Sequence, residues 1–269
     1  MSSSKTAIYS ALAANLLIAI TKFVAAAITR SSAMMSEGIH SLVDTSNEIL
    51  LLLGLRKSKR KPDAERPFGY SKELYFWSFI VSILIFGVGG GISFYEGITH
   101  LQHPEVIQDP LWNYIVLGVA LVFDGSSFVI ALRNFNRQRG DIPFWTAVKK
   151  SRDPSSFVVL FEDAADVLGL LIALAGVYLG HRLQNPYFDG VASILIGLLL
   201  TAVSLVLARE SRSLLMGETA SPQALQQVVQ FAEGNTAVES VKQHLSMVLG
   251  PEEVLLILRI KVRKNFSSP

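Results

Sequence analysis

The sequence predicts an all-α membrane protein, a bundle of six transmembrane helices followed by a small, incomplete α+β cytoplasmic domain. Three observations lead to this prediction. Half of the 269 residues are apolar, only 17% are charged and the mean hydropathy is +0.40, whereas a soluble domain needs a more strongly charged surface. Apolar stretches long enough to cross a bilayer recur along the chain, and the composition changes after Met216-Gly217.

Six apolar stretches have the length of a membrane-spanning helix, which needs roughly 20 mainly apolar residues. Lys22 interrupts the first stretch, and no small-residue cleavage site follows it, so we interpret it as a span rather than as a secretory signal. The six stretches define a transmembrane domain at residues 1–215. The predicted spans are Ala7–Ile28, Ala33–Leu55, Leu74–Thr99, Leu111–Leu132, Phe157–Leu179 and Phe188–Leu207.

The connections between these spans differ in charge. The loop Arg56–Pro67 is strongly basic, and the segment Arg133–Arg152 carries six Lys or Arg. The connections on the opposite side carry Arg30 and Arg182. Basic loops stay on the cytoplasmic side of a membrane, so both termini are predicted to be cytoplasmic.

The basic clusters have a second interpretation, which is nucleic-acid binding. Exposed aromatic residues are not interleaved with them, so we interpret the clusters as topology signals that also contact anionic lipid headgroups. We therefore expect a lipid bilayer as a partner and no nucleic acid. Because no Arg-rich leader precedes the first span, the expected location is a bacterial inner (plasma) membrane.

The C-terminal residues 216–269 form the α+β part of the prediction. Ser221-Pro222 is typical of a helix start, and the amphipathic helix is expected to reach Ala232. Two β-rich runs, Val238–Leu249 and Val254–Val262, are joined by Gly250-Pro251 and predict a hairpin. About fifty residues are marginal for an independent core. A partner chain therefore completes this domain, or the domain is truncated at Ser268-Pro269.

Ionisable residues concentrate in the second predicted span. His40 and Asp44 are four residues apart and Asn47 follows three residues later, so an imidazole, a carboxylate and an amide share one helix face. An ionisable side chain at membrane depth costs about 3 kcal/mol or more, so such residues indicate a functional site.

The fifth predicted span carries a matching pair. Glu162 and Asp166 are also four residues apart, and Asp163 lies about 100° around the helix from Glu162. The small residues Ala164, Ala165 and Gly169 would let this helix approach a neighbour closely. Two facing pairs then predict a shell of one imidazole nitrogen and three carboxylates, in which a cation or protons neutralise the charge.

The ligand types leave the metal open. The chain has no cysteine, so thiolate sites are excluded. Zinc takes tetrahedral imidazole and carboxylate ligands, and an oxygen-rich shell also suits manganese or ferrous iron. The predicted ligands are His40, Asp44, Glu162 and Asp166, with Asn47 and Asp163 as secondary candidates.

Other polar residues have simpler interpretations. Lys22 is expected to snorkel or to contact a carbonyl inside the bundle, and Glu37 to lie at the mouth of a pathway. Asp124 is either an accessory carboxylate or a packing residue. Asp189 is expected to cap the sixth span. The histidines His100, His103 and His181 are assigned to external loops, and His244 to the first strand of the tail.

Two long segments resemble a known family. The second span and its sequel, SSAMMSEGIHSLVDTSNEILLLLGL and PFGYSKELYFW, are similar to the cation diffusion facilitators, also called the zinc-transporter solute carriers. The run KSRDPSSFVVLFEDAADVLG resembles the zinc transporter 9 branch of that family. The resemblance covers nearly the whole chain.

This resemblance implies a homodimeric antiporter that exports a divalent cation, usually zinc, in exchange for protons by alternating access. It also implies that His40 and Asp44 of the second span, with Glu162 and Asp166 of the fifth, form the intramembrane site. The commoner family pattern has His at the position of Glu162, whereas zinc transporter 9-like members have the Glu-Asp pair and lack a carboxylate at the position of Asp166. This chain combines both features.

Two alternatives come from other functional classes. An intramembrane hydrolase would use a carboxylate pair as acid and base, but the chain has no HExxH or other recognised catalytic signature, so we do not expect an enzyme. A metal sensor or assembly partner that does not transport would share the binding site and lack flux. In the preferred interpretation the metal is a substrate, and no cofactor is expected.

Overall fold

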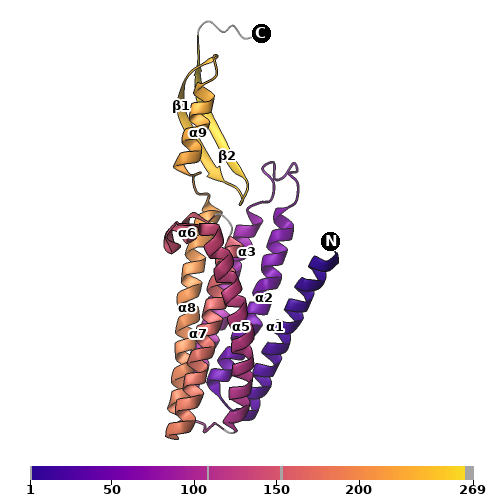
Figure 1. Ribbon diagram of the computed structural model, residues 1–269, viewed down its shortest axis with the longest axis vertical. Helices are drawn as coiled ribbons and strands as arrows, with labels where there is room; N and C mark the ends of the chain where they lie inside the picture. The colour runs from indigo at the N-terminus through magenta and orange to yellow at the C-terminus, as the bar shows by residue number, and fades with distance from the viewer. Residues whose placement is uncertain (1, 108, 152–153, 264–269) are drawn as a thin grey trace.

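The bundle consists of long helical segments arranged side by side (Figure 1). The computed structural model describes residues 2–107, 109–151 and 154–263. The polypeptide passes back and forth, so that the first helix begins and the last bundle helix ends at the end that carries the C-terminal α+β unit (Figure 1). The bundle segments are α1 (Ser2–Thr29), α2 (Ser32–Ser58), α3 (Glu73–Leu84), η1 (Ile85–Gly90), α4 (Gly91–Gln102), α5 (Pro110–Arg139), α7 (Pro154–Leu183) and α8 (Tyr187–Met216).

Several of these helices can cross a membrane by length and composition. Within the described residues, three segments satisfy both criteria, Glu73–Gln102, Pro110–Arg139 and Tyr187–Met216, and Asn15–Thr29 is a shorter apolar helix. Helices α2 and α7 have 27 and 30 residues and carry the ionisable residues of the candidate site. The predicted fold class, a helical membrane bundle followed by a small α+β unit, is confirmed.

The segment from α3 to α4 is one continuous helix with a wide turn inside it. In η1 the backbone N–H of Gly91 donates to the carbonyl of Phe86, five residues earlier, which is π-helical bonding. Beyond this turn, α4 packs closely on α8. A Cβ on Gly97 would lie 2.8 Å from the carbonyl oxygen of Gly190, and a Cβ on Gly197 would lie 2.9 Å from that of Gly90. Glycine at these positions therefore lets the two backbones touch.

A short helix, α6 (Phe144–Lys150), was not predicted from the sequence. It lies in the basic connection between α5 and α7, at the end of the bundle near the α+β unit (Figure 1). Its aromatic residues pack against the bundle. The ring centroid of Phe144 lies 5.3 Å from that of Phe135 on α5 and 6.4 Å from that of Phe161 on α7. Seven residues give too little periodicity for a sequence prediction.

The α+β unit contains α9 (Pro222–Glu233) and an antiparallel hairpin of β1 (Val238–Val248) and β2 (Val254–Val262). Ser221 caps α9, because its hydroxyl accepts a hydrogen bond from the backbone N–H of Ala224. No residue of α9, all of which the structure describes, is buried, and Phe231 is 86% exposed. The unit therefore has little core of its own.

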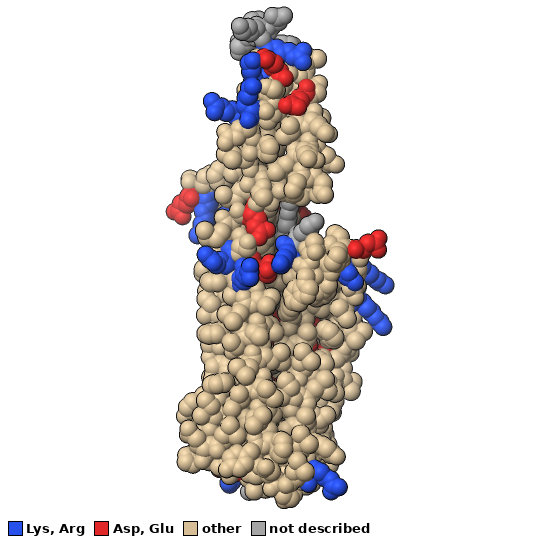
Figure 2. All heavy atoms as spheres, turned by 90° about the vertical axis from the view of Figure 1, so that its left-hand side faces the viewer, with Lys and Arg blue, Asp and Glu red and all other residues tan. Residues whose placement is uncertain are grey.

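Charge is distributed unevenly along the molecule. Figure 2 shows Lys and Arg gathered at the level where the bundle meets the α+β unit, with a wide uncharged surface below them. Exposed basic residues here include Arg56 in the last turn of α2 and Lys59, Arg60 and Lys61 in the connection that follows. This arrangement is typical of the cytoplasmic end of a membrane protein.

Candidate metal centre

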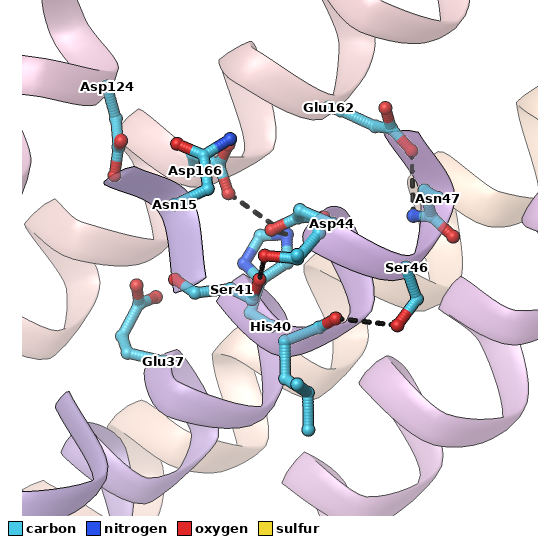
Figure 3. A network of polar contacts seen from close by, with 12 residues as sticks. Asn15, Glu37, His40, Ser41, Asp44, Ser46, Asn47, Asp124, Glu162 and Asp166 are labelled. Carbon is cyan, nitrogen blue, oxygen red and sulfur yellow. Dashed lines mark hydrogen bonds and ion pairs between the residues drawn. The ribbon is translucent and has the colours of Figure 1, made fainter. Parts of the chain in front are cut away.

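Three of the predicted ligands meet between α2 and α7 (Figure 3). The Nε2 atom of His40 lies 3.6 Å from Asp44 Oδ2 on the same helix and 3.3 Å from Asp166 Oδ1 on α7. One ligand atom from each residue lies within 4.8 Å of the other two. The His40 side chain is 2% exposed, whereas Asp44 and Asp166 are 16% and 15% exposed, so the cluster is largely enclosed. One imidazole and two carboxylates in this arrangement suit a divalent cation.

The local sequence explains this geometry. Side chains four residues apart share a helix face, which places Asp44 one turn beyond His40 on α2. On α7, Ala165 is buried beside Asp166 and adds little bulk, so that the helix can bring its carboxylate close to α2.

Glu162, the fourth predicted ligand, has a different partner. Its carboxylate Oε1 accepts a 2.8 Å hydrogen bond from Nδ2 of Asn47, so an amide of α2 holds it one turn of α7 away from Asp166 (Figure 3). Both side chains are buried. The structure therefore brings together three of the four predicted ligands, while Glu162 stays near the cluster in a hydrogen bond with a secondary candidate.

A cavity of about 160 Å³ adjoins the cluster. With about 30 Å³ per water molecule, it has room for roughly five waters or a partly hydrated cation. Four helices, α1, α2, α5 and α7, form its wall. The residues that line it are Asn15, Ile18, Ser41, Asp44, Glu48, Phe123, Asp124, Ser127, Val159, Glu162, Asp163 and Asp166.

Further carboxylates of the wall have their own partners. Asp163, the other secondary candidate, accepts a 2.9 Å hydrogen bond from the Ser127 hydroxyl, and Glu48 accepts a 2.8 Å bond from the Asn15 amide. Asp124 lies 4.0 Å from Lys22 Nζ and lines the cavity, which fits the accessory role better than the packing role. The cavity wall is therefore strongly acidic, and such a wall attracts cations.

Lys22 and Glu37 differ from their predicted roles. In the part of the chain that the structure describes, Lys22 neither snorkels nor hydrogen-bonds to a carbonyl: its ammonium group donates to Glu37 Oε2 at 3.1 Å and to Ser41 Oγ at 2.7 Å. Both charged side chains are fully buried, so Glu37 is not at the mouth of a pathway. The sequence indicated that Lys22 and Glu37 could pair, because a buried charge in an apolar span is stabilised by an opposite charge. The pair itself is evident only from the packing of α1 on α2.

Asp189 also differs from its predicted role. It lies in the first turn of α8 but does not cap that helix; its carboxylate accepts hydrogen bonds from Ser31 Oγ at 2.6 Å and from the backbone N–H of Ser32 at 2.5 Å. These groups are at the start of α2. Asp189 therefore satisfies N–H groups of the site-bearing helix, where a carboxylate is favoured.

The remaining histidines are separate from the centre. His100 was assigned to an external loop, but it lies on α4, is 8% exposed and places Nε2 3.8 Å from Asp189 Oδ2. His103 follows the end of α4, and His181 is in the last turn of α7. His244 lies on β1 as predicted, paired with Leu258 of β2.

Four side-chain atoms around the centre have no hydrogen-bond partner among the described residues. They are Glu37 Oε1, His40 Nδ1, Asp44 Oδ1 and Asn47 Oδ1. Buried polar atoms without partners are rare and call for an explanation. A cation or water in the cavity would supply a partner to the oxygen of Asp44.

Fold and site together define a multi-pass helical membrane protein with an enclosed histidine and carboxylate cluster inside its bundle. The sequence matches the Cation efflux transmembrane domain family over residues 8–216, which is most of the chain. The chain therefore belongs to the cation efflux family, a family of transporters.

Curated relatives support this assignment. The chain is 37% identical over 248 residues to the proton-coupled zinc antiporter SLC30A9, mitochondrial, of Xenopus laevis, covering 91% of this chain and 44% of that protein. It is 32% identical over 251 residues to metal tolerance protein C4 of Arabidopsis thaliana, covering 92% of this chain and 55% of that protein. It is 26% identical over 263 residues to the manganese efflux system protein MneP of Bacillus subtilis, covering 95% of this chain and 77% of that protein. The chain thus spans about half the length of the first two relatives.

Proposed function

We propose that this protein exports a divalent metal cation, zinc in preference to manganese or ferrous iron, in exchange for protons. The observation that carries the proposal is the meeting of His40 Nε2, Asp44 Oδ2 and Asp166 Oδ1 beside an acidic cavity in the bundle. The names of the frog and Arabidopsis relatives refer to zinc antiport and metal tolerance, which agrees with this function.

The proposed ligand set is His40, Asp44, Asp166 and Glu162. In the metal-free arrangement Asn47 holds Glu162, and the carboxylate joins the metal when this hydrogen bond breaks. Three carboxylates and one imidazole then complete a tetrahedral shell, which zinc prefers in sites without thiolates. Asp163 remains with Ser127 and contributes charge to the entry path.

Proton exchange follows from competition for the same atoms. Carboxylates and imidazole bind a metal only when they are deprotonated, so protons that arrive from the opposite side displace it. Alternating access then requires a rearrangement of helices around the site. The imidazole nitrogen of His40 favours zinc over harder cations, which prefer oxygen.

The domain organisation, assembly and location belong to the same proposal. Residues 1–215 form the transport domain, and residues 216–269 form part of a dimerisation and regulatory domain. The uncovered surface of α9, with Phe231 86% exposed, supports pairing with a second copy in a homodimer. The band of basic residues supports cytoplasmic termini. We place the protein in a bacterial inner membrane, and localisation of a tagged chain tests this placement.

Transport into proteoliposomes tests the function. Zinc, manganese and ferrous iron are supplied separately, with and without a pH gradient, to wild-type protein and to Asp166→Ala. Asp141→Ala is the matched control, because Asp141 is exposed in the connection before α6. We expect zinc flux that needs the gradient, falls to background in Asp166→Ala and persists in Asp141→Ala. Zinc binding without flux of any metal in folded wild-type protein would overturn transport and favour a metal sensor.

A further inference from the structure

Two buried atoms beside the metal centre lack partners and are chemically complementary. His40 Nδ1 and Glu37 Oε1 have no hydrogen-bond partner in the part of the chain that the structure describes. An imidazole nitrogen can donate a proton, and a carboxylate oxygen accepts one. Glu37 is 0% exposed and His40 is 2% exposed, so water does not reach them freely.

Both atoms face the same point on α7. A Cβ on Gly169 would lie 2.5 Å from Glu37 Oε1 and 3.8 Å from His40 Nδ1. Because glycine has no side chain, it leaves this space to the carboxylate and the ring. Figure 3 shows the Glu37 and Asp44 carboxylates on opposite sides of the His40 ring.

The other ring nitrogen fixes which atom of His40 carries the proton. Nε2 faces Asp44 and Asp166, so it is the nitrogen that would bind a metal. A neutral imidazole that offers the Nε2 lone pair must be protonated at Nδ1. Metal-binding histidines usually donate this second N–H to a carboxylate or carbonyl, which fixes the tautomer and the ring orientation.

We propose that Glu37 is a positioning residue for His40, accepting the Nδ1–H of its ring and directing Nε2 at the metal. Lys22 holds the other oxygen of the same carboxylate at 3.1 Å, and the Ser41 hydroxyl holds Lys22 at 2.7 Å. The ammonium group thus offsets the charge of Glu37. The structure shows the contact between Lys22 and Glu37, and the hydrogen bond from His40 Nδ1 to Glu37 Oε1 is the step that the proposal adds.

This inference rests on the proposed function, because it assumes that His40 binds the metal. The tautomer of His40 can nevertheless be measured in the metal-free protein. Without the acceptor, the ring can place its proton on Nε2, where the N–H points at Asp44 and Asp166 and blocks coordination. Glu37 therefore favours nitrogen coordination by His40 without joining the metal.

The test compares two double variants that both remove the buried ion pair. Lys22→Met with Glu37→Gln keeps a carbonyl oxygen as acceptor at position 37, whereas Lys22→Met with Glu37→Leu removes it. Histidine is labelled with ¹⁵N, and the His40 signals are assigned by their loss in His40→Asn. Nitrogen NMR of the metal-free protein at pH 8 reports the tautomer, and a zinc titration reports the dissociation constant.

We expect the Nδ1–H tautomer in the wild type and in the Gln variant, and its loss in the Leu variant. Zinc should bind the Leu variant about 10- to 100-fold more weakly than the Gln variant. Gly169→Ala, which displaces the Glu37 carboxylate, is a single substitution that should also lose the tautomer if the double variants do not fold. An unchanged Nδ1–H tautomer in the folded Leu variant or in Gly169→Ala would overturn the inference. If the wild type shows the tautomer but binds no zinc, the positioning stands and the proposed function fails.

Discussion

The carboxylate of Asp189, on α8, accepts hydrogen bonds from both the backbone N–H and the hydroxyl of Ser32, at the start of α2. These residues are 157 positions apart in the chain. The contact ties the last helix of the bundle to the helix that carries His40 and Asp44. It adds a cap supplied across the bundle to the local one, in which the Ser31 hydroxyl accepts a hydrogen bond from the backbone N–H of Met34.

Removal of this contact should loosen α2. In Asp189→Ala the N–H of Ser32 and the hydroxyl of Ser31 lose a buried charged acceptor, at a cost of about 1–3 kcal/mol. We expect the melting temperature in detergent to fall by several degrees. The control is Asp141→Ala, since Asp141 is exposed in the connection before α6. Equal melting of Asp189→Ala and the wild type would contradict the role given to Asp189.

Asn47 should weaken zinc binding in the wild-type protein, because its amide competes with the metal for Glu162. In Asn47→Leu the 2.8 Å hydrogen bond is lost and Glu162 is free to coordinate. A hydrogen bond to a charged group contributes about 1.5–3 kcal/mol, so we expect zinc to bind about 10-fold more tightly and to leave more slowly. Equilibrium titration and stopped-flow release with a chelator measure the two quantities. Weaker binding in this variant would show that Asn47 assists the metal instead.

Zinc binding should release protons. The ligands must be deprotonated to coordinate, so zinc affinity should rise with pH as proton competition weakens. Calorimetry in buffers of different ionisation enthalpy counts the protons released. Asp166→Asn should release fewer protons than the wild type. Asp163→Asn is the comparison, because Asp163 lines the cavity but is hydrogen-bonded to Ser127. A proton count that does not change in Asp166→Asn would exclude Asp166 as the exchanging group.

The basic connection after α2 contains a titratable contact of its own. The Tyr70 hydroxyl donates a 2.5 Å hydrogen bond to Asp63 Oδ2, which lowers the pKa of Asp63 and raises the pKa of Tyr70. Because the folded pKa of Asp63 is depressed, this contact stabilises the loop above the ordinary Asp pKa and is lost as pH falls through the lowered value. In Tyr70→Phe the pKa of Asp63 should rise toward its ordinary range, as measured by carboxyl NMR. No change in Asp63 titration would contradict the contact.

The sequence predicted those parts of the molecule that depend on local pattern. Apolar length predicted the bundle helices, and the Ser221-Pro222 start and two β-rich runs predicted α9 and the hairpin. The four-residue spacing of His40 and Asp44 placed both on one face of α2. These features depend on residues within a few turns or one strand of each other.

The features that the sequence did not predict depend on distant partners. The partner of Lys22 is 15 residues away on the next helix, and that of Asp189 is on α2. The fourth ligand position also depends on a distant contact, because Asn47 and Glu162 are 115 residues apart and their hydrogen bond requires a particular approach of α2 and α7. Residue spacing shows which side chains share a helix face, but it does not show which residues of a neighbouring helix that face contacts.

The π-helical turn at η1 makes the third membrane segment unusually tolerant of a change in length. A π turn contains one residue more than an α turn, so a single deletion between Ile85 and Gly90 would convert it to regular α-helix and keep the faces of α3 and α4 in line. The same deletion elsewhere in the segment would rotate one half by about 100° relative to the other. Gly97 would then turn away from Gly190, and the close packing on α8 would be lost. Length variation among homologous chains should therefore fall within this one turn.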